Sequence, residues 1–144
     1  MSHVSAYTTE IVFQTVAKGG RLEEDPAWEI LQQAVQAVAE AHGGHINQTV
    51  RDIFGRPTAC DIAVHVPHLK GGLGMSIDRR TGELLFLYDD YGRVAEFQAL
   101  KDEVVQNFSA LAVAKALQAL HYQVDVEETG LGGERRVLVR GVLA

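Results

Sequence analysis

Alternating hydrophobic and polar positions predict the strands of this chain. Residues 60–66 and 73–77 place apolar side chains at every second position, which is typical of half-buried strands. Residues 84–87 are apolar at every position, as in a strand that is covered on both faces or central in a sheet. Residues 5–13 are rich in β-branched and aromatic side chains and predict a first strand, and residues 45–51 predict a weaker one.

A longer apolar period predicts two helices. The first opens at Asp25-Pro26, because Asp accepts amide hydrogen bonds at an N-cap and Pro fits the first helical position. It stops at Gly43-Gly44, where glycine permits a left-handed C-terminal residue. The second covers Val94–Leu120, with two apolar stripes that change over at Asn107–Ser109 and predict a kink or a break there.

The C-terminal pattern predicts a hairpin. Val124 and Val126 alternate with Gln123, Asp125 and Glu127. On the return strand, Val137 and Val139 alternate with Arg136, Leu138 and Arg140, so antiparallel pairing would set acids and arginines on one face. The element order is therefore β-α-β-β-β-β-α-β-β, which is not a repeating βαβ series. We predict a single α+β domain over residues 1–144, with a mixed or mainly antiparallel sheet and two principal helices packed on one face.

Two segments between these elements are predicted to be irregular. Residues 16–24 carry a Gly-Gly pair and charges, which favour a loop. Lys70-Gly71-Gly72-Leu73-Gly74 resembles a phosphate-binding loop, but it leads into a strand rather than a helix, and no Ser or Thr follows the Lys at the required position. We interpret it as a flexible hairpin connection.

Composition narrows the functional class. With 144 residues, the chain is long enough to form an ordinary hydrophobic core. Its net charge of −6 disfavours binding to nucleic acid. No apolar run reaches the ~20 residues that span a bilayer. Residues 1–5 show no charged region followed by an apolar one, so we expect no secretion signal. Cys60 is the only cysteine, which excludes an internal disulfide and fits a reducing compartment. We expect a soluble, cytoplasmic protein that needs no cofactor.

The most promising site is the corner Tyr88-Asp89-Asp90-Tyr91-Gly92, where a strand leads into a helix. Two carboxylates could bind a cation or act as acid and base, and the phenols could hydrogen-bond a ligand. In a strand, however, Asp89 and Asp90 point to opposite faces, so only a turn can bring them together. The simpler interpretation is that both acids lie at the N-terminus of the following helix, where negative charge is favoured.

Other reactive residues are weaker candidates. Asp61 or His65 could reach the corner from a neighbouring strand. The pair His65 and His68 resembles a metal-ligand spacing, but the six histidines match no recognised ligand pattern, and we predict no metal site. Cys60 shares a strand face with Ile62 and Val64, which indicates a small core residue rather than a nucleophile.

Several landmarks resemble domain-of-unknown-function family 1257, which includes a hypothetical plastid and cyanobacterial reading frame. They are Met1-Ser2-His3 with Thr9-Glu10-Ile11, Cys60-Asp61-Ile62-Ala63-Val64, Gly74-Met75, the corner at residues 88–92, and Tyr122-Gln123-Val124 with Val137-Leu138-Val139-Arg140. The resemblance implies a small soluble bacterial or plastid protein that accompanies an ATPase. It implies no catalytic residues.

Two hypotheses of different class follow. The leading one is a non-catalytic protein-binding or adaptor module that self-associates through a sheet edge or helix face, because every reactive residue has a structural explanation. The alternative is a small enzyme or small-molecule- or metal-binding protein with its pocket at the corner. Tyr88, Asp89, Asp90 and Tyr91 would line that pocket, with Asp61 or His65 reaching in.

Overall fold

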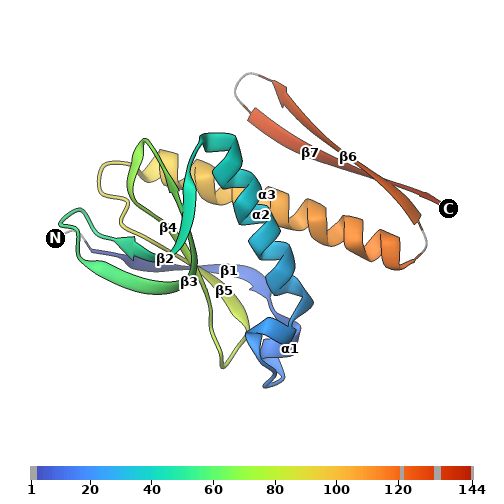
Figure 1. Ribbon diagram of the computed structural model, residues 1–144, viewed down its shortest axis with the longest axis horizontal. Coiled ribbons are helices and arrows are strands. Elements are labelled where there is room, and N and C mark those ends of the chain that lie inside the picture. Colours follow the sequence, from blue (N-terminus) through green and yellow to red (C-terminus); the bar gives the residue numbers. More distant parts are fainter. Residues whose placement is uncertain (1–2, 121, 132–133, 144) are drawn as a thin grey trace.

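The computed structural model describes residues 3–120, 122–131 and 134–143, with side chains up to Leu120 (Figure 1). Its elements follow in this order: β1 (Ser5–Val12), α1 (Gln14–Ala17), the 3-10 turn η1 (Leu22–Glu24), α2 (Pro26–His42), β2 (His45–Arg51), β3 (Pro57–Val66), β4 (Leu69–Ile77), β5 (Glu83–Tyr88), α3 (Val94–Ala119), β6 (Tyr122–Leu131) and β7 (Glu134–Leu143).

Strands β1 to β5 form one antiparallel sheet in the order β1-β5-β4-β3-β2. Successive hairpins connect β2 through β5, and β1 then pairs with β5, so that Tyr7 lies opposite Phe86. The edge strands of this sheet are therefore β1 and β2. The predicted α+β class with a mainly antiparallel sheet is confirmed, and the weaker strand over residues 45–51 is present as β2.

Helices α2 and α3 both lie over the same face of this sheet (Figure 1), as the sequence predicts. The alternation in β3 and β4 turns one set of side chains toward them, and the helical stripes supply the other half of the core. The buried core includes Ile62, Val64, Leu73, Met75 and Phe86 from the sheet, Leu31, Val35 and Val38 from α2, and Phe97, Leu100 and Val104 from α3. Within the described residues, no helix combines the length and apolar composition that crossing a bilayer requires.

The side chain of Asp25 is hydrogen-bonded to both α1 and α2. One carboxylate oxygen accepts the backbone N–H of Ala27 at 3.0 Å and caps α2, as the sequence predicts. The other oxygen accepts the N–H groups of Thr15 and Val16 at 2.9 and 3.2 Å, at the start of α1. The loop predicted for residues 16–24 is therefore partly wrong, because it contains the end of α1 and the turn η1.

Helix α3 is continuous through Asn107–Ser109, so the predicted break is wrong. The Asn107 side chain donates to the Glu103 carbonyl at 2.8 Å, which satisfies it inside the helix without opening a turn. Strands β6 and β7 form a separate two-stranded sheet beside the C-terminal half of α3 (Figure 1). Their register confirms the predicted hairpin, with Asp125 opposite Arg140.

Two further predictions fail on the β3–β4 hairpin. Residues 70–74 belong to β4 and not to a flexible connection, which is only Pro67-His68. A register shift between the β2 and β3 partners gives β3 extra residues around Cys60. As a result, the Cys60 thiol lies on the side of Gly74 opposite the core, away from Ile62 and Val64.

Candidate functional site

The predicted corner, residues 88–92, leaves the sheet at the end of β5 and leads into α3. Tyr88 is buried, and its ring stacks on those of Tyr7 and Phe97 with centroid distances of 4.4 and 4.8 Å. Burial, with smaller contributions from Tyr7 and then from Asp90 and Asp102, raises the pKa of Tyr88 to about 12. Tyr88 is therefore a core side chain that fixes where the corner begins.

The two aspartates of the corner turn toward different partners. Asp89 is buried, and its oxygens accept the backbone N–H groups of Tyr91 at 3.2 Å and Ile53 at 3.0 Å. Asp90 accepts the hydroxyl of Tyr7 at 3.1 Å, and burial followed by this bond raises the pKa of Tyr7. The two carboxylates thus accept hydrogen bonds from different parts of the chain, Asp89 from backbone amides and Asp90 from the β1 tyrosine.

The interpretation of these acids as caps for the following helix is also not what the structure shows. The N-cap residue of α3 is Arg93, and its side chain makes no capping hydrogen bond. The Asp90 carboxylate accepts the Tyr7 hydroxyl, and the Asp89 carboxylate accepts the N–H groups of Ile53 and Tyr91, both of which precede α3. Asp89 instead ties the corner to residues 52–56, the turn that connects β2 to β3.

Asp52 holds that turn in shape. One of its oxygens accepts the N–H groups of Phe54 and Arg56, each at 2.9 Å, and the other pairs with the Arg56 guanidinium. Burial alone would raise the pKa of Asp52, but the Arg56 amide and guanidinium and the Phe54 amide hold it below its ordinary value. The turn is thus internally hydrogen-bonded as well as bound to Asp89.

These two connected segments and the first residue of α3 expose large apolar side chains. The exposed fractions are 46% for Ile53, 67% for Phe54, 68% for Tyr91 and 51% for Val94. We call these four residues the tip surface. The Arg56 guanidinium lies 5.3 Å from the Phe54 ring centroid, within range of a cation–π interaction. Ile53 and Phe54 were not identified from sequence, although two adjacent apolar residues inside a turn are the signal that marks them.

Asp61 and His65 are not brought to the corner. Asp61 accepts two hydrogen bonds from the Arg79 guanidinium, at 2.8 and 3.0 Å, and a third from the Ile77 amide. His65 lies two strands from β5; its Nε2 is 2.9 Å from both the Asn47 side-chain oxygen and the Thr49 carbonyl. Both side chains fix the shape of β3 and its neighbours.

Histidines gather near the end of α2 without forming a metal centre. The His42 ring contacts Glu103 at 2.6 Å and lies 6.0 Å from the His68 ring, while His45 and His65 stack at 4.9 Å. Among the side chains that the structure describes, no three His, Cys, Asp or Glu residues are placed to hold one ion. His42 and Glu103 instead link α2 to α3.

Cys60 has the chemistry of a structural thiol. Burial raises its pKa to about 11, and nearby Asp61 adds to the shift. Because the thiolate is the reactive form, Cys60 is a poor nucleophile near neutral pH. Its place beside Val50 and Gly74 gives it a packing role.

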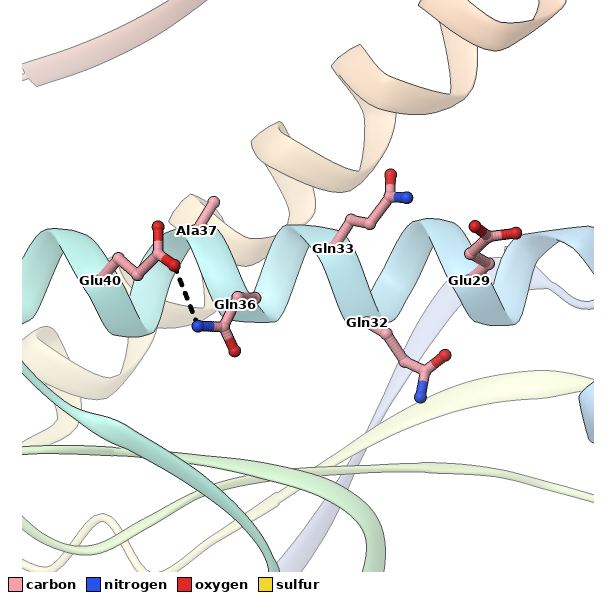
Figure 2. Close-up of a pocket in the computed structure, with 6 residues that line it drawn as sticks. All are labelled: Glu29, Gln32, Gln33, Gln36, Ala37 and Glu40. Carbon is pink, nitrogen blue, oxygen red and sulfur yellow. Dashed lines mark hydrogen bonds between the residues drawn. The ribbon is translucent and has the colours of Figure 1, made fainter.

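A shallow depression of about 500 Å³ runs along the outer side of α2 (Figure 2). Its described lining consists of long polar side chains and one alanine: Glu29, Gln32, Gln33, Gln36, Ala37 and Glu40. Gln36 donates to Glu40 at 3.0 Å, and the others extend along the helix without converging on a common point (Figure 2). This arrangement is an open polar helix face, and no predicted site residue borders it.

Comparisons of the chain with protein-family models, with curated proteins and with solved structures find no match. The resemblance to domain-of-unknown-function family 1257 therefore stays a prediction.

Proposed function

We propose that this protein is a non-catalytic protein-binding module whose contact surface is the tip surface. The observation that carries the proposal is the exposure of Ile53, Phe54, Tyr91 and Val94 on two segments that one buried carboxylate holds together. Grouped apolar side chains on a protein surface are typical of interaction sites, and aromatic residues dominate the energetics of protein interfaces.

The hydrogen bonding of the turn supports the same conclusion. Asp52 and Asp89 between them accept four backbone N–H groups, so Ile53, Phe54 and Tyr91 are presented on an ordered backbone. A surface that is ordered before binding loses less conformational entropy on association. The acidic groups of the corner serve this framework, which favours a binding role over acid–base chemistry.

The proposal is tested by a double substitution, Phe54→Ser with Tyr91→Ser, in affinity capture from the native host lysate. The matched control is Val113→Ser, which removes an apolar side chain of α3 that is 49% exposed. We expect the double variant to lose the captured protein while its free energy of unfolding changes by less than about 1 kcal/mol, since both side chains are exposed. Capture that is equal for the double variant and the wild type would show that the tip surface is not the interface.

A further inference from the structure

The charges around the tip surface are sorted by depth. Asp52 and Asp89 are buried, and their oxygens face backbone amides and the Arg56 guanidinium. Arg51 and Arg93, in contrast, are exposed at the two ends of the connected segments. Asp90 and, in the first turn of α3, Glu96 are half-buried. Among the charged side chains of residues 51–56 and 88–94, the exposed ones are therefore all arginines.

Each arginine has donors suited to an incoming acid. Arg51 donates one Nη1 hydrogen bond to the Gly55 carbonyl at 2.7 Å, which orients its guanidinium at the base of the turn. Arg93 is the N-cap residue of α3 and its carbonyl accepts the N–H of Phe97, while its exposed side chain makes no capping hydrogen bond. A guanidinium has five N–H donors in a planar fork that matches a carboxylate.

We infer that the tip surface binds an acidic segment of another protein, in which apolar or aromatic side chains are flanked by Asp or Glu. This inference rests on the proposed function and adds the chemistry of the partner. The apolar side chains pack on Phe54 and Tyr91, and the flanking carboxylates pair with Arg51 and Arg93. The local cations are needed because the whole chain carries a net charge of −6, which repels an acidic partner at longer range.

The test uses two fluorescein-labelled peptides of equal length, both containing alternating Leu and Phe. One carries Glu and Asp between them and the other carries Lys and Arg. Fluorescence anisotropy is measured with the wild type, with Arg51→Glu/Arg93→Glu, with Phe54→Ser, and with Arg80→Glu as the control. Arg80 is an exposed arginine of the β4–β5 turn, away from the tip surface.

We expect the wild type and Arg80→Glu to bind the acidic peptide at least about tenfold more tightly than the basic one, a difference well within anisotropy measurement. Phe54→Ser should weaken this binding about tenfold, and the double charge reversal should reverse the preference. A wild type that binds both peptides equally, prefers the basic one or binds neither overturns the inference. So does acidic-peptide binding that survives the charge reversal.

Two further measurements separate this inference from the proposed function. A concentration-dependent dimer in sedimentation velocity that Phe54→Ser abolishes would assign the tip surface to a second copy of the chain and overturn the acidic segment. If Phe54→Ser/Tyr91→Ser abolishes capture from lysate but Arg51→Glu/Arg93→Glu does not, the proposed function stands and the inference fails. Capture that survives both substitutions overturns both.

Discussion

The carboxylate of Asp89 accepts the backbone N–H of Ile53 at 3.0 Å, across 36 positions of sequence. Its other oxygen accepts the N–H of Tyr91, so one buried side chain connects the β2–β3 turn with the start of the segment that leads to α3. Neither local segment needs this geometry by itself. The relationship is what brings Phe54 and Tyr91 to the same end of the molecule.

Asp89→Ala should therefore loosen the tip surface and destabilise the protein. The substitution leaves two backbone N–H groups without their acceptor, and each such loss costs about 1–3 kcal/mol when the group stays buried. We expect a fall of about 2 kcal/mol in the free energy of unfolding, from urea titrations followed by the fluorescence of Trp28, the single tryptophan. Hydrogen exchange at the Ile53 amide should become faster.

Asp90→Ala is the matched control for that experiment. It removes the neighbouring carboxylate but loses only the half-buried hydrogen bond from the Tyr7 hydroxyl. The backbone amide of Ile53 should keep its wild-type exchange rate in this variant. Equal exchange rates at Ile53 in both variants would show that Asp89 does not hold the turn.

Asp25→Ala should destabilise the other end of the fold. Its carboxylate accepts three backbone N–H groups, from Thr15, Val16 and Ala27, and is 5% exposed. Loss of a helix N-cap alone costs about 0.5–2 kcal/mol, and the two further amides of α1 add to it. We expect a total of about 2–4 kcal/mol in urea titration, whereas Asp25→Asn should lose less because its amide oxygen still accepts. A loss below about 0.5 kcal/mol in Asp25→Ala would contradict the double role.

The sequence predicts the elements of this fold well wherever the signal is local. Alternation identifies β3 and β4, and the pair Asp25-Pro26 with Gly43 marks both ends of α2, because these patterns depend on residues only a few positions apart. The contact made by the second carboxylate oxygen of Asp25 could not be predicted in this way. That oxygen binds α1 ten residues earlier, and no residue pattern in α1 indicates that acceptor.

The glycines of β4 show why other boundaries were missed. Gly71 and Gly72 have φ values of +86° and +80°. In a sequence, two adjacent glycines are typical of a turn, because glycine adopts positive φ readily. In the folded chain they lie inside the strand, where a Cβ on Gly72 would meet the His65 ring and one on Gly71 would meet the Arg51 carbonyl. The need for glycine comes from close packing with β2 and β3, so it cannot be recognised from β4 alone.

One part of the candidate site could likewise be predicted from local sequence, and another part could not. The corner at residues 88–92 was identified because a strand-to-helix junction with acids and phenols is a local pattern. Its true neighbours, Ile53 and Phe54, were missed because the bond to Asp89 depends on how β2 and β3 cross the sheet. Asp61 and His65 were assigned to the corner on the assumption that β3 adjoins β5, and β4 separates the two strands.

Gly74→Ala should test the packing on the sheet face opposite the helices. A Cβ at Gly74 would lie 2.7 Å from Cγ1 of Val50, which is fully buried, and 3.1 Å from the Cys60 thiol. We expect a loss of about 1–3 kcal/mol in the free energy of unfolding, since overpacking in a buried site has that cost. In Gly74→Ala/Val50→Ala the added methyl group occupies space that Val50 has left. The double variant should therefore lose less than the sum of the two single variants, and strict additivity would contradict the contact.

Cys60 and Tyr88 should make the protein less stable in alkali. Burial raises the pKa of Cys60 from 9.0 to about 11 and that of Tyr88 from 10.0 to about 12. Between each pair of values the unfolded chain has lost the proton and the folded chain retains it. The unfolded state then binds fewer protons, so the free energy of unfolding falls as pH rises. Urea titrations should show this decline beginning near pH 9 and continuing through pH 11.

Cys60→Ala separates the contributions of Cys60 and Tyr88 to this loss of stability, because it removes the group whose unfolded-state pKa is lower. The variant should lose the part of the decline that begins near pH 9 and keep the part above pH 10 that belongs to Tyr88. Alkylation by iodoacetamide gives an independent measurement: native Cys60 should react far more slowly at pH 9 than the same thiol in urea, since only the thiolate attacks. Equal alkylation rates in native and unfolded protein would mean that the thiol is not protected by the packing of Val50 and Gly74, and the alkaline decline would then need another cause.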